Sequence, residues 1–132
     1  MPKRRPRYLL DTGVLIRHLR HHGPTTRLLR ELGRQDFLAI SAITRLEIRV
    51  GMREHERYIT NKLLSRLITL DIDAEVADLA GDLLRKYRNT QTPLTIPDAI
   101  IAATALRHGL ILVTYNPKDF PMPNLLLYPT NP

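Results

Sequence analysis

The chain has 132 residues, 43% hydrophobic and 25% charged, proportions that predict one globular domain over residues 1–132. It contains no cysteine, which excludes a disulfide scaffold, thiolate catalysis and zinc sites built on sulfur. The net charge is +7, and residues 1–34 carry this whole excess because they hold nine basic and two acidic residues. Such a segment, with its basic leader at residues 1–7, favours a polyanion or an acidic partner; a solvated leader that only aids solubility is the alternative.

No targeting segment is evident. Asp11 interrupts the apolar run Tyr8-Leu9-Leu10, far short of the apolar core of a signal peptide. No stretch approaches the ~18 apolar residues that a membrane span needs. We therefore expect a cytoplasmic protein with no membrane contact.

The first half of the chain alternates short apolar runs with helical patterns. The pair Gly23-Pro24 is expected to end one helix, and Gly33 the next. We expect strands over residues 9–10 and 37–40 and helices over 14–20, 25–32, 41–52 and 53–67.

The second half continues this alternation. Asp73 is expected to cap a helix whose apolar residues recur with helical spacing up to Tyr87. Pro97 marks the start of a helix that reaches Arg107 and ends at Gly109. Strands are expected over residues 68–70 and 110–113, and residues 125–127 are a candidate last strand.

Short apolar strands that alternate with amphipathic helices predict an α/β fold: a parallel sheet with helices on both faces. Ligands of such sheets bind at the carboxyl ends of the strands. Polar residues at those ends are therefore the candidates for chemistry.

Five such residues lie near predicted strand or helix ends: Asp11, Glu47, Asp98, Asn116 and Asp119. Taken singly, the first three also fit helix caps or capping boxes, and the last fits a plain loop residue. Taken together, carboxylates that meet at one edge repel one another unless a cation neutralises them. An all-oxygen donor set favours a hard cation such as Mg²⁺ or Mn²⁺, which acidic nuclease sites use on phosphodiesters.

Four runs of the sequence resemble the motifs of PIN-domain ribonucleases, in the order found in that family. They are residues 8–16 (YLLDTGVLI), 41–47 (SAITRLE), 96–105 (IPDAIIAATA) and 112–120 (LVTYNPKDF). The resemblance is greatest to VapC-like toxins of toxin–antitoxin pairs. It implies a three-layer α/β/α sandwich with a central parallel sheet, and cleavage of RNA with Mg²⁺ or Mn²⁺.

Residue by residue, the resemblance implies that Asp11, Glu47 and Asp98 bind the metal. Asn116 stands where some members have the fourth acid, and Asp119 is the other candidate for that role.

The resemblance also implies residues that line the site, and the basic first quarter of the chain indicates residues that hold substrate. Thr12 and Thr114 match positions that line the site, and Gly13 replaces the Asn or Ser common in the family. Arg17 and Arg20, with the rest of the basic segment, are expected to hold RNA phosphates. For Tyr115, two interpretations stay open: it stacks on a base, or it fills a groove.

The expected partners are an RNA substrate, a cognate VapB-like antitoxin and a second copy in a homodimer. The antitoxin is expected to cover the basic surface with an acidic tail and to place an Arg or Lys among the three metal-binding acids. Two alternatives stay open: a PIN nuclease of RNA processing without an antitoxin, and a non-catalytic basic nucleic-acid-binding domain. The apolar residues Tyr58, Leu63, Leu64 and Leu67 belong either to the core or to a partner surface.

Overall fold

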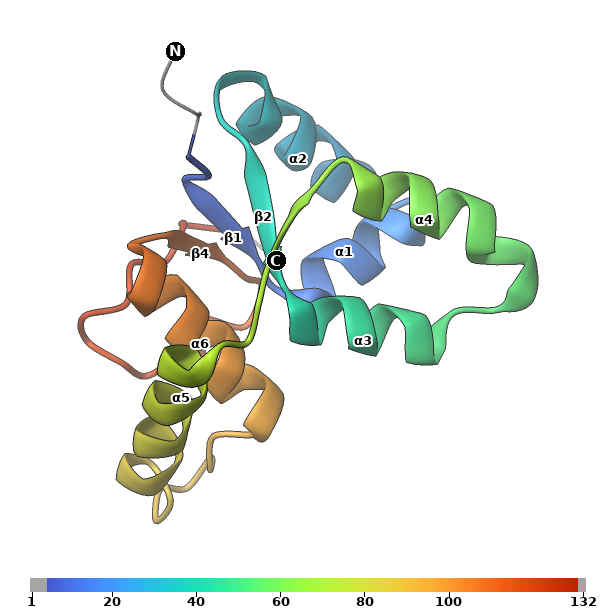
Figure 1. Cartoon of the computed structure of the whole chain (residues 1–132). Coiled ribbons are helices and arrows are strands. Elements are labelled where there is room, and N and C mark those ends of the chain that lie inside the picture. Colours follow the sequence, from blue (N-terminus) through green and yellow to red (C-terminus); the bar gives the residue numbers. More distant parts are fainter. Residues whose placement is uncertain (1–4, 131–132) are drawn as a thin grey trace.

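The computed structural model describes residues 5–130, so Lys3 and Arg4 of the predicted basic leader lie outside the described residues. Its centre is a parallel sheet in the strand order β3-β2-β1-β4 (Figure 1). In this sheet Leu9 lies opposite both Ala39 and Leu112. The strands are β1 (Tyr8–Leu10), β2 (Leu38–Ser41), β3 (Ile68–Leu70) and β4 (Ile111–Val113).

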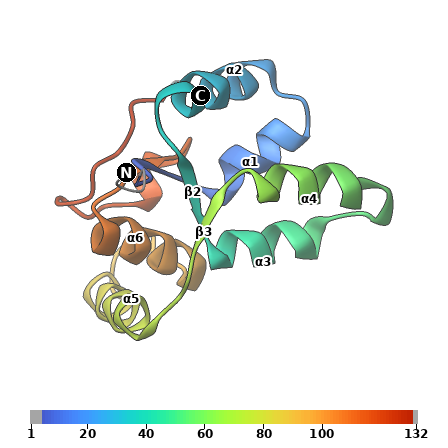
Figure 2. The same ribbon diagram turned by 45° about the horizontal axis from the view of Figure 1, so that its top comes forward.

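Helices cover both faces of the sheet. One face packs against α1, α2 and α4, and the other against α5 and α6 (Figure 2). This arrangement confirms the expected three-layer α/β/α sandwich. The helices are α1 (Thr12–Leu19), α2 (Gly23–Gln35), α3 (Ala42–Gly51), α4 (Arg57–Ser65), α5 (Ala74–Lys86) and α6 (Ile96–His108), with short 3₁₀ turns η1 (Glu54–Glu56) and η2 (Pro117–Asp119).

Two apolar cores result because side chains of a strand point alternately to the two faces. Leu9 packs with Ala102 of α6 in one core, and Leu10 packs with Val14 of α1 in the other. All four residues are fully buried. The central strands are therefore covered on both sides, which explains why they read as continuous apolar runs.

Four expectations about the elements were wrong in detail. Gly23 and Pro24 begin α2 instead of ending α1, since Pro fits the first turn of a helix, and Gly33 lies inside α2. The helix expected over residues 53–67 is divided into η1 and α4. The candidate last strand contributes only a bridge between Leu127 and Leu112.

At the carboxyl edge of the sheet, hydrogen bonds join the ends of the strands to one another and to the start of a helix. The Asp11 amide donates to the Val113 carbonyl at 3.0 Å, which joins the ends of β1 and β4. Ser41 ends β2 and caps α3 through the Ile43 amide. Among the described residues, no helix is long and apolar enough to cross a membrane.

Candidate active site at the carboxyl edge of the sheet

Asp11 is the N-cap of α1, and both of its carboxylate oxygens accept a hydrogen bond. The Thr12 amide donates to Oδ1 at 2.9 Å, and the Thr114 hydroxyl donates to Oδ2 at 2.8 Å. The side chain is only 8% exposed, and burial raises its pKa above the ordinary value. The capping interpretation of Asp11 is confirmed, and metal binding by the same residue stays a prediction.

Glu47 lies on α3 and is held by a hydroxyl from α1. The Thr12 hydroxyl donates to Glu47 Oε1 at 2.7 Å and lies 3.0 Å from the Thr44 hydroxyl. Because Thr12 has a single hydroxyl proton, Thr44 must be the donor in the second contact. Ser41 caps α3, so Glu47 is not spent on the capping box that the Thr44–Glu47 spacing suggested.

Asp98 lies in the first turn of α6, where Thr95 is the N-cap and accepts from the Asp98 amide at 3.3 Å. Desolvation, together with the neighbouring charges of Asp11, Asp119 and Glu47, raises the pKa of Asp98 to about 6. The neighbouring carboxylates therefore repel the charged form of Asp98.

Asp119, in η2, contributes to the electrostatics of the same region. Its charge raises the pKa values of both Asp11 and Asp98. Asn116 is exposed and takes part through its backbone, whose amide donates to the Thr114 hydroxyl at 3.0 Å. Of the two candidates for the fourth acidic position, Asp119 is the one that adds charge. We call Asp11, Glu47, Asp98 and Asp119 the acidic edge.

No basic side chain within residues 5–130 forms an ion pair with the acidic edge. Its donors are all carboxylate oxygens, which suit Mg²⁺ or Mn²⁺ chemically. In the described part of the chain, no three His, Asp or Glu side chains are drawn together as a ready-made metal site.

The residues expected to hold substrate fall into two groups. Thr12 and Thr114 are buried, and their hydroxyl protons go to Glu47 and Asp11. Arg20 is exposed at the end of α1. The Arg17 guanidinium lies over the Tyr115 ring, 4.1 Å from its centre. Substrate contact by these residues stays a prediction.

Two features escaped sequence reasoning. The Thr44 hydroxyl orders the Thr12–Glu47 pair, although Thr44 lies 32 positions from Thr12. The Thr25–Tyr115 hydrogen bond joins residues that are 90 positions apart, and no local signal marks such a pair.

The comparisons with known proteins identify the family of the chain and agree with its fold. The PIN domain family model matches residues 8–121. Ribonuclease VapC10 of Mycobacterium tuberculosis is 36% identical over 114 residues, which cover 86% of each chain. Ribonuclease VapC19 of the same species is 32% identical over 115 residues, covering 86% of this chain and 92% of that protein.

Solved structures are similar as well. A toxin–antitoxin complex from Klebsiella pneumoniae contains a chain that is 31% identical, with a TM-score of 0.77 over 93% of this chain and 98% of that one. VapBC2 from Rickettsia felis, bound to a DNA fragment from its promoter, gives 27% identity and a TM-score of 0.79 over 92% and 96% of the two chains.

Proposed function

Because this chain belongs to the PIN-domain family, we propose that it is the ribonuclease toxin of a toxin–antitoxin pair, cleaving RNA with a divalent cation at the acidic edge. One observation carries the proposal. At the carboxyl end of the sheet, burial and the nearby charges of Glu47 and Asp119 raise the pKa values of Asp11 and Asp98. Among residues 5–130 no cationic side chain neutralises them.

Asp11, Glu47 and Asp98 would hold Mg²⁺ or Mn²⁺, and the carboxylate of Asp119 would add negative charge near them. When bound, such a cation stabilises charge on a phosphodiester and lowers the pKa of a bound water. The chain's own part is to keep the carboxylates placed. Thr114 anchors Asp11, and Thr12 anchors Glu47.

The attacking group in this scheme is water. The hydroxyls of Thr12 and Thr114 already donate to carboxylates, so neither is set up as a nucleophile with a free base beside it. Cysteine is absent from the sequence. Hydrolysis without a covalent intermediate is therefore the reaction that fits this site.

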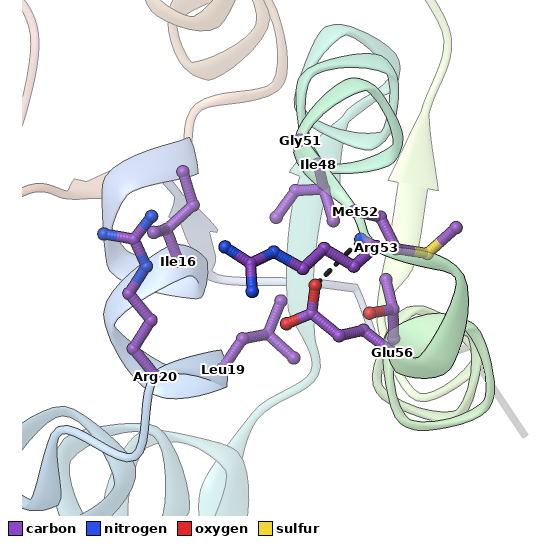
Figure 3. A pocket seen from close by; sticks show the side chains of 9 residues that line it. Ile16, Leu19, Arg20, Ile48, Gly51, Met52, Arg53 and Glu56 are labelled. Carbon is purple, nitrogen blue, oxygen red and sulfur yellow. Dashed lines mark hydrogen bonds between the residues drawn. The ribbon is translucent and has the colours of Figure 1, made fainter.

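The antitoxin has a surface to bind. Apolar side chains are exposed on α3, where Val50 is 79% exposed, and on α4, where Tyr58 is 75% exposed. Tyr58 thus lies outside the core, whereas Leu64 is buried in it. A cavity of about 380 Å³ opens between α1, α3 and η1 (Figure 3).

That cavity is lined by both apolar and charged side chains. Ile16 and Leu19 of α1 face Ile48 of α3, and the Arg53 side chain extends across the space between them (Figure 3). An antitoxin helix with apolar side chains and an acidic flank complements this surface. Its tail would reach the acidic edge with an Arg or Lys. A homodimer would compete for the exposed faces of α3 and α4.

The test of the activity is cleavage of total RNA in Mg²⁺, in Mn²⁺ and in EDTA, by the wild type and by Asp11→Asn. We expect cleavage only by the wild type with a cation. RNA binding that is insensitive to EDTA, without cleavage, would assign the chain to the alternative class of basic nucleic-acid-binding domains.

The test of the partner is co-expression with the product of the adjacent small reading frame. We expect the two proteins to co-purify and cleavage to be suppressed. An active nuclease that neither captures nor responds to that neighbour would contradict the toxin assignment and favour a nuclease of RNA processing.

A further inference from the structure

Tyr115 follows Thr114, the residue that anchors Asp11, and its ring is fixed in place. Its hydroxyl lies 2.7 Å from the hydroxyl of Thr25, which is fully buried. Thr25 in turn contacts His22 Nδ1 at 2.7 Å. The His22 ring meets the Tyr115 ring edge-on, with centres 6.3 Å apart. The start of α2 therefore holds Tyr115 from two sides.

The fixed ring carries a cation. The Arg17 guanidinium carbon lies 4.1 Å from the centre of the Tyr115 ring, a distance at which the negative face of the ring attracts the guanidinium. Within residues 5–130 no carboxylate pairs with Arg17. The ring therefore orients the Arg17 guanidinium without neutralising its positive charge.

Both residues of this pair lie on segments that also hold Asp11 of the acidic edge. Arg17 is on α1, whose N-cap is Asp11, and Tyr115 directly follows Thr114, which donates to Asp11. Carboxylates repel the phosphates of an incoming RNA. A cation that is fixed at this place offsets the repulsion by attracting a phosphate. A guanidinium binds phosphate through several N–H groups, and it loses less freedom on binding if it is already held.

We propose that Tyr115 is a positioning residue that holds Arg17 to bind an RNA phosphate beside the acidic edge. The inference rests on the proposed ribonuclease function and refines its substrate contact. Of the two interpretations of Tyr115 left open by the sequence, it argues against base stacking, since a base on this ring face would have to displace Arg17.

The test is a double-mutant cycle on single-turnover RNA cleavage by the full chain with Mn²⁺, using Arg17→Ala, Tyr115→Leu and both together. We expect Arg17→Ala and Tyr115→Leu each to weaken apparent RNA affinity about tenfold, as loss of one charged hydrogen-bonding contact does. The double variant should be no weaker than Arg17→Ala alone. Tyr115→Phe keeps the ring and its edge contact with His22 but not the bond to Thr25, so it should lose less affinity than Tyr115→Leu.

Matched controls separate positioning from folding. Arg20→Ala removes a charge of the same helix that lies on no aromatic ring described here, so its effect should multiply with that of Tyr115→Leu. Arg17→Lys keeps the charge without the planar stack and should still lose affinity, which keeps the test valid if Tyr115→Leu does not fold.

The outcomes are distinguishable. Effects of Arg17→Ala and Tyr115→Leu that simply multiply, or full affinity in Arg17→Ala or Arg17→Lys, would overturn the inference while wild-type cleavage leaves the proposed function standing. Loss of antitoxin binding without loss of RNA affinity would assign Arg17 to the partner and overturn it too. A wild type that neither binds nor cleaves RNA would overturn both.

Discussion

At the scale of single residues, buried threonine hydroxyls organise the acidic edge. Thr114 is 1% exposed. Its hydroxyl donates a hydrogen bond to Asp11 and accepts one from the Asn116 amide. Thr12 does the same for Glu47. Each carboxylate is thereby held in one orientation by a group that cannot ionise.

Replacing Thr114 with Val keeps the shape of the side chain and removes the proton donated to Asp11. A buried acceptor without its donor costs about 1–3 kcal/mol, so the free energy of unfolding should fall by that order and RNA cleavage should fall at least tenfold. Urea unfolding and cleavage rates measure the two effects. Thr104→Val is the matched control, because the Thr104 hydroxyl only bonds the Ile100 carbonyl inside α6; a similar loss of cleavage there would contradict the assignment.

The pKa of Asp98, raised to about 6, gives the site a pH dependence. The folded state holds the proton more tightly than the unfolded chain, whose Asp has a pKa near 3.8. The stability gained from the protonated form is therefore present at low pH and is lost as the pH rises through about 6.

We therefore expect Asp98→Asn to be more stable than the wild type in EDTA at pH 8, and the difference to vanish near pH 4. The gain should be about 1 kcal/mol, well below the full linkage value, because solvent screens a partly exposed carboxyl. Thermal unfolding at several pH values measures it. A wild type more stable than Asp98→Asn at pH 8 would show that Asp98 is not repelled by its neighbours.

At the scale of elements, the sequence predicts what local chemistry decides. The helix stop at Gly109 is real because this glycine adopts φ +65°, and Asp73 caps α5 through the Val76 amide as expected. The start of α2 was missed because Gly23-Pro24 is compatible with both a helix end and a helix start. The 3₁₀ turn η1 arises from the Glu56 carboxylate, which accepts from the Arg53 amide at 2.8 Å.

The same distinction between local and long-range contacts holds for the candidate site. Asp11, Glu47 and Asp98 were identified from their places near strand and helix ends and from the family motifs. The contacts that hold Asp11 and Glu47 were not, because Thr114 lies 103 positions from Asp11 and Thr12 lies 35 positions from Glu47. Such pairs depend on strand order, which short apolar runs do not specify.

Gly13 in α1 and Gly81 in α5 each have open space where a Cβ would lie. Ala at either position should raise the free energy of unfolding by about 0.5–1 kcal/mol, since Gly weakens a helix by that amount. Gly109→Ala should instead destabilise by about 1 kcal/mol, because its left-handed conformation strains a side chain. Urea midpoints check all three, and cleavage by Gly13→Ala should equal that of the wild type. A loss of stability in Gly13→Ala would mean that α1 has no room beside Asp11.

At the scale of the whole molecule, charge is distributed unevenly along the chain. The positive excess lies in residues 1–34, so the arginines of α1 and α2 are expected to hold RNA. Removing Arg27 and Arg30 together should lower the slope of log affinity against log salt by about two units or less. Filter binding of RNA in Ca²⁺ across a salt series measures the slope.

Lys86→Ala with Arg88→Ala removes two exposed charges near the end of α5 and serves as the matched control. In this control, the slope of log affinity against log salt should stay at the wild-type value. Equal losses in the two pairs would indicate a general effect of net charge, without a binding surface on α1 and α2.

We infer that the acidic edge is a single site for a divalent cation, and calorimetric titration with Mn²⁺ measures that binding. The wild type should bind Mn²⁺ at pH 7.5, and Glu47→Gln and Asp98→Asn should each bind at least tenfold more weakly because a ligand charge is lost. Glu75→Gln changes an acid of α5 that pairs with Arg107 and should bind like the wild type. Wild-type affinity in Glu47→Gln and Asp98→Asn would contradict the account.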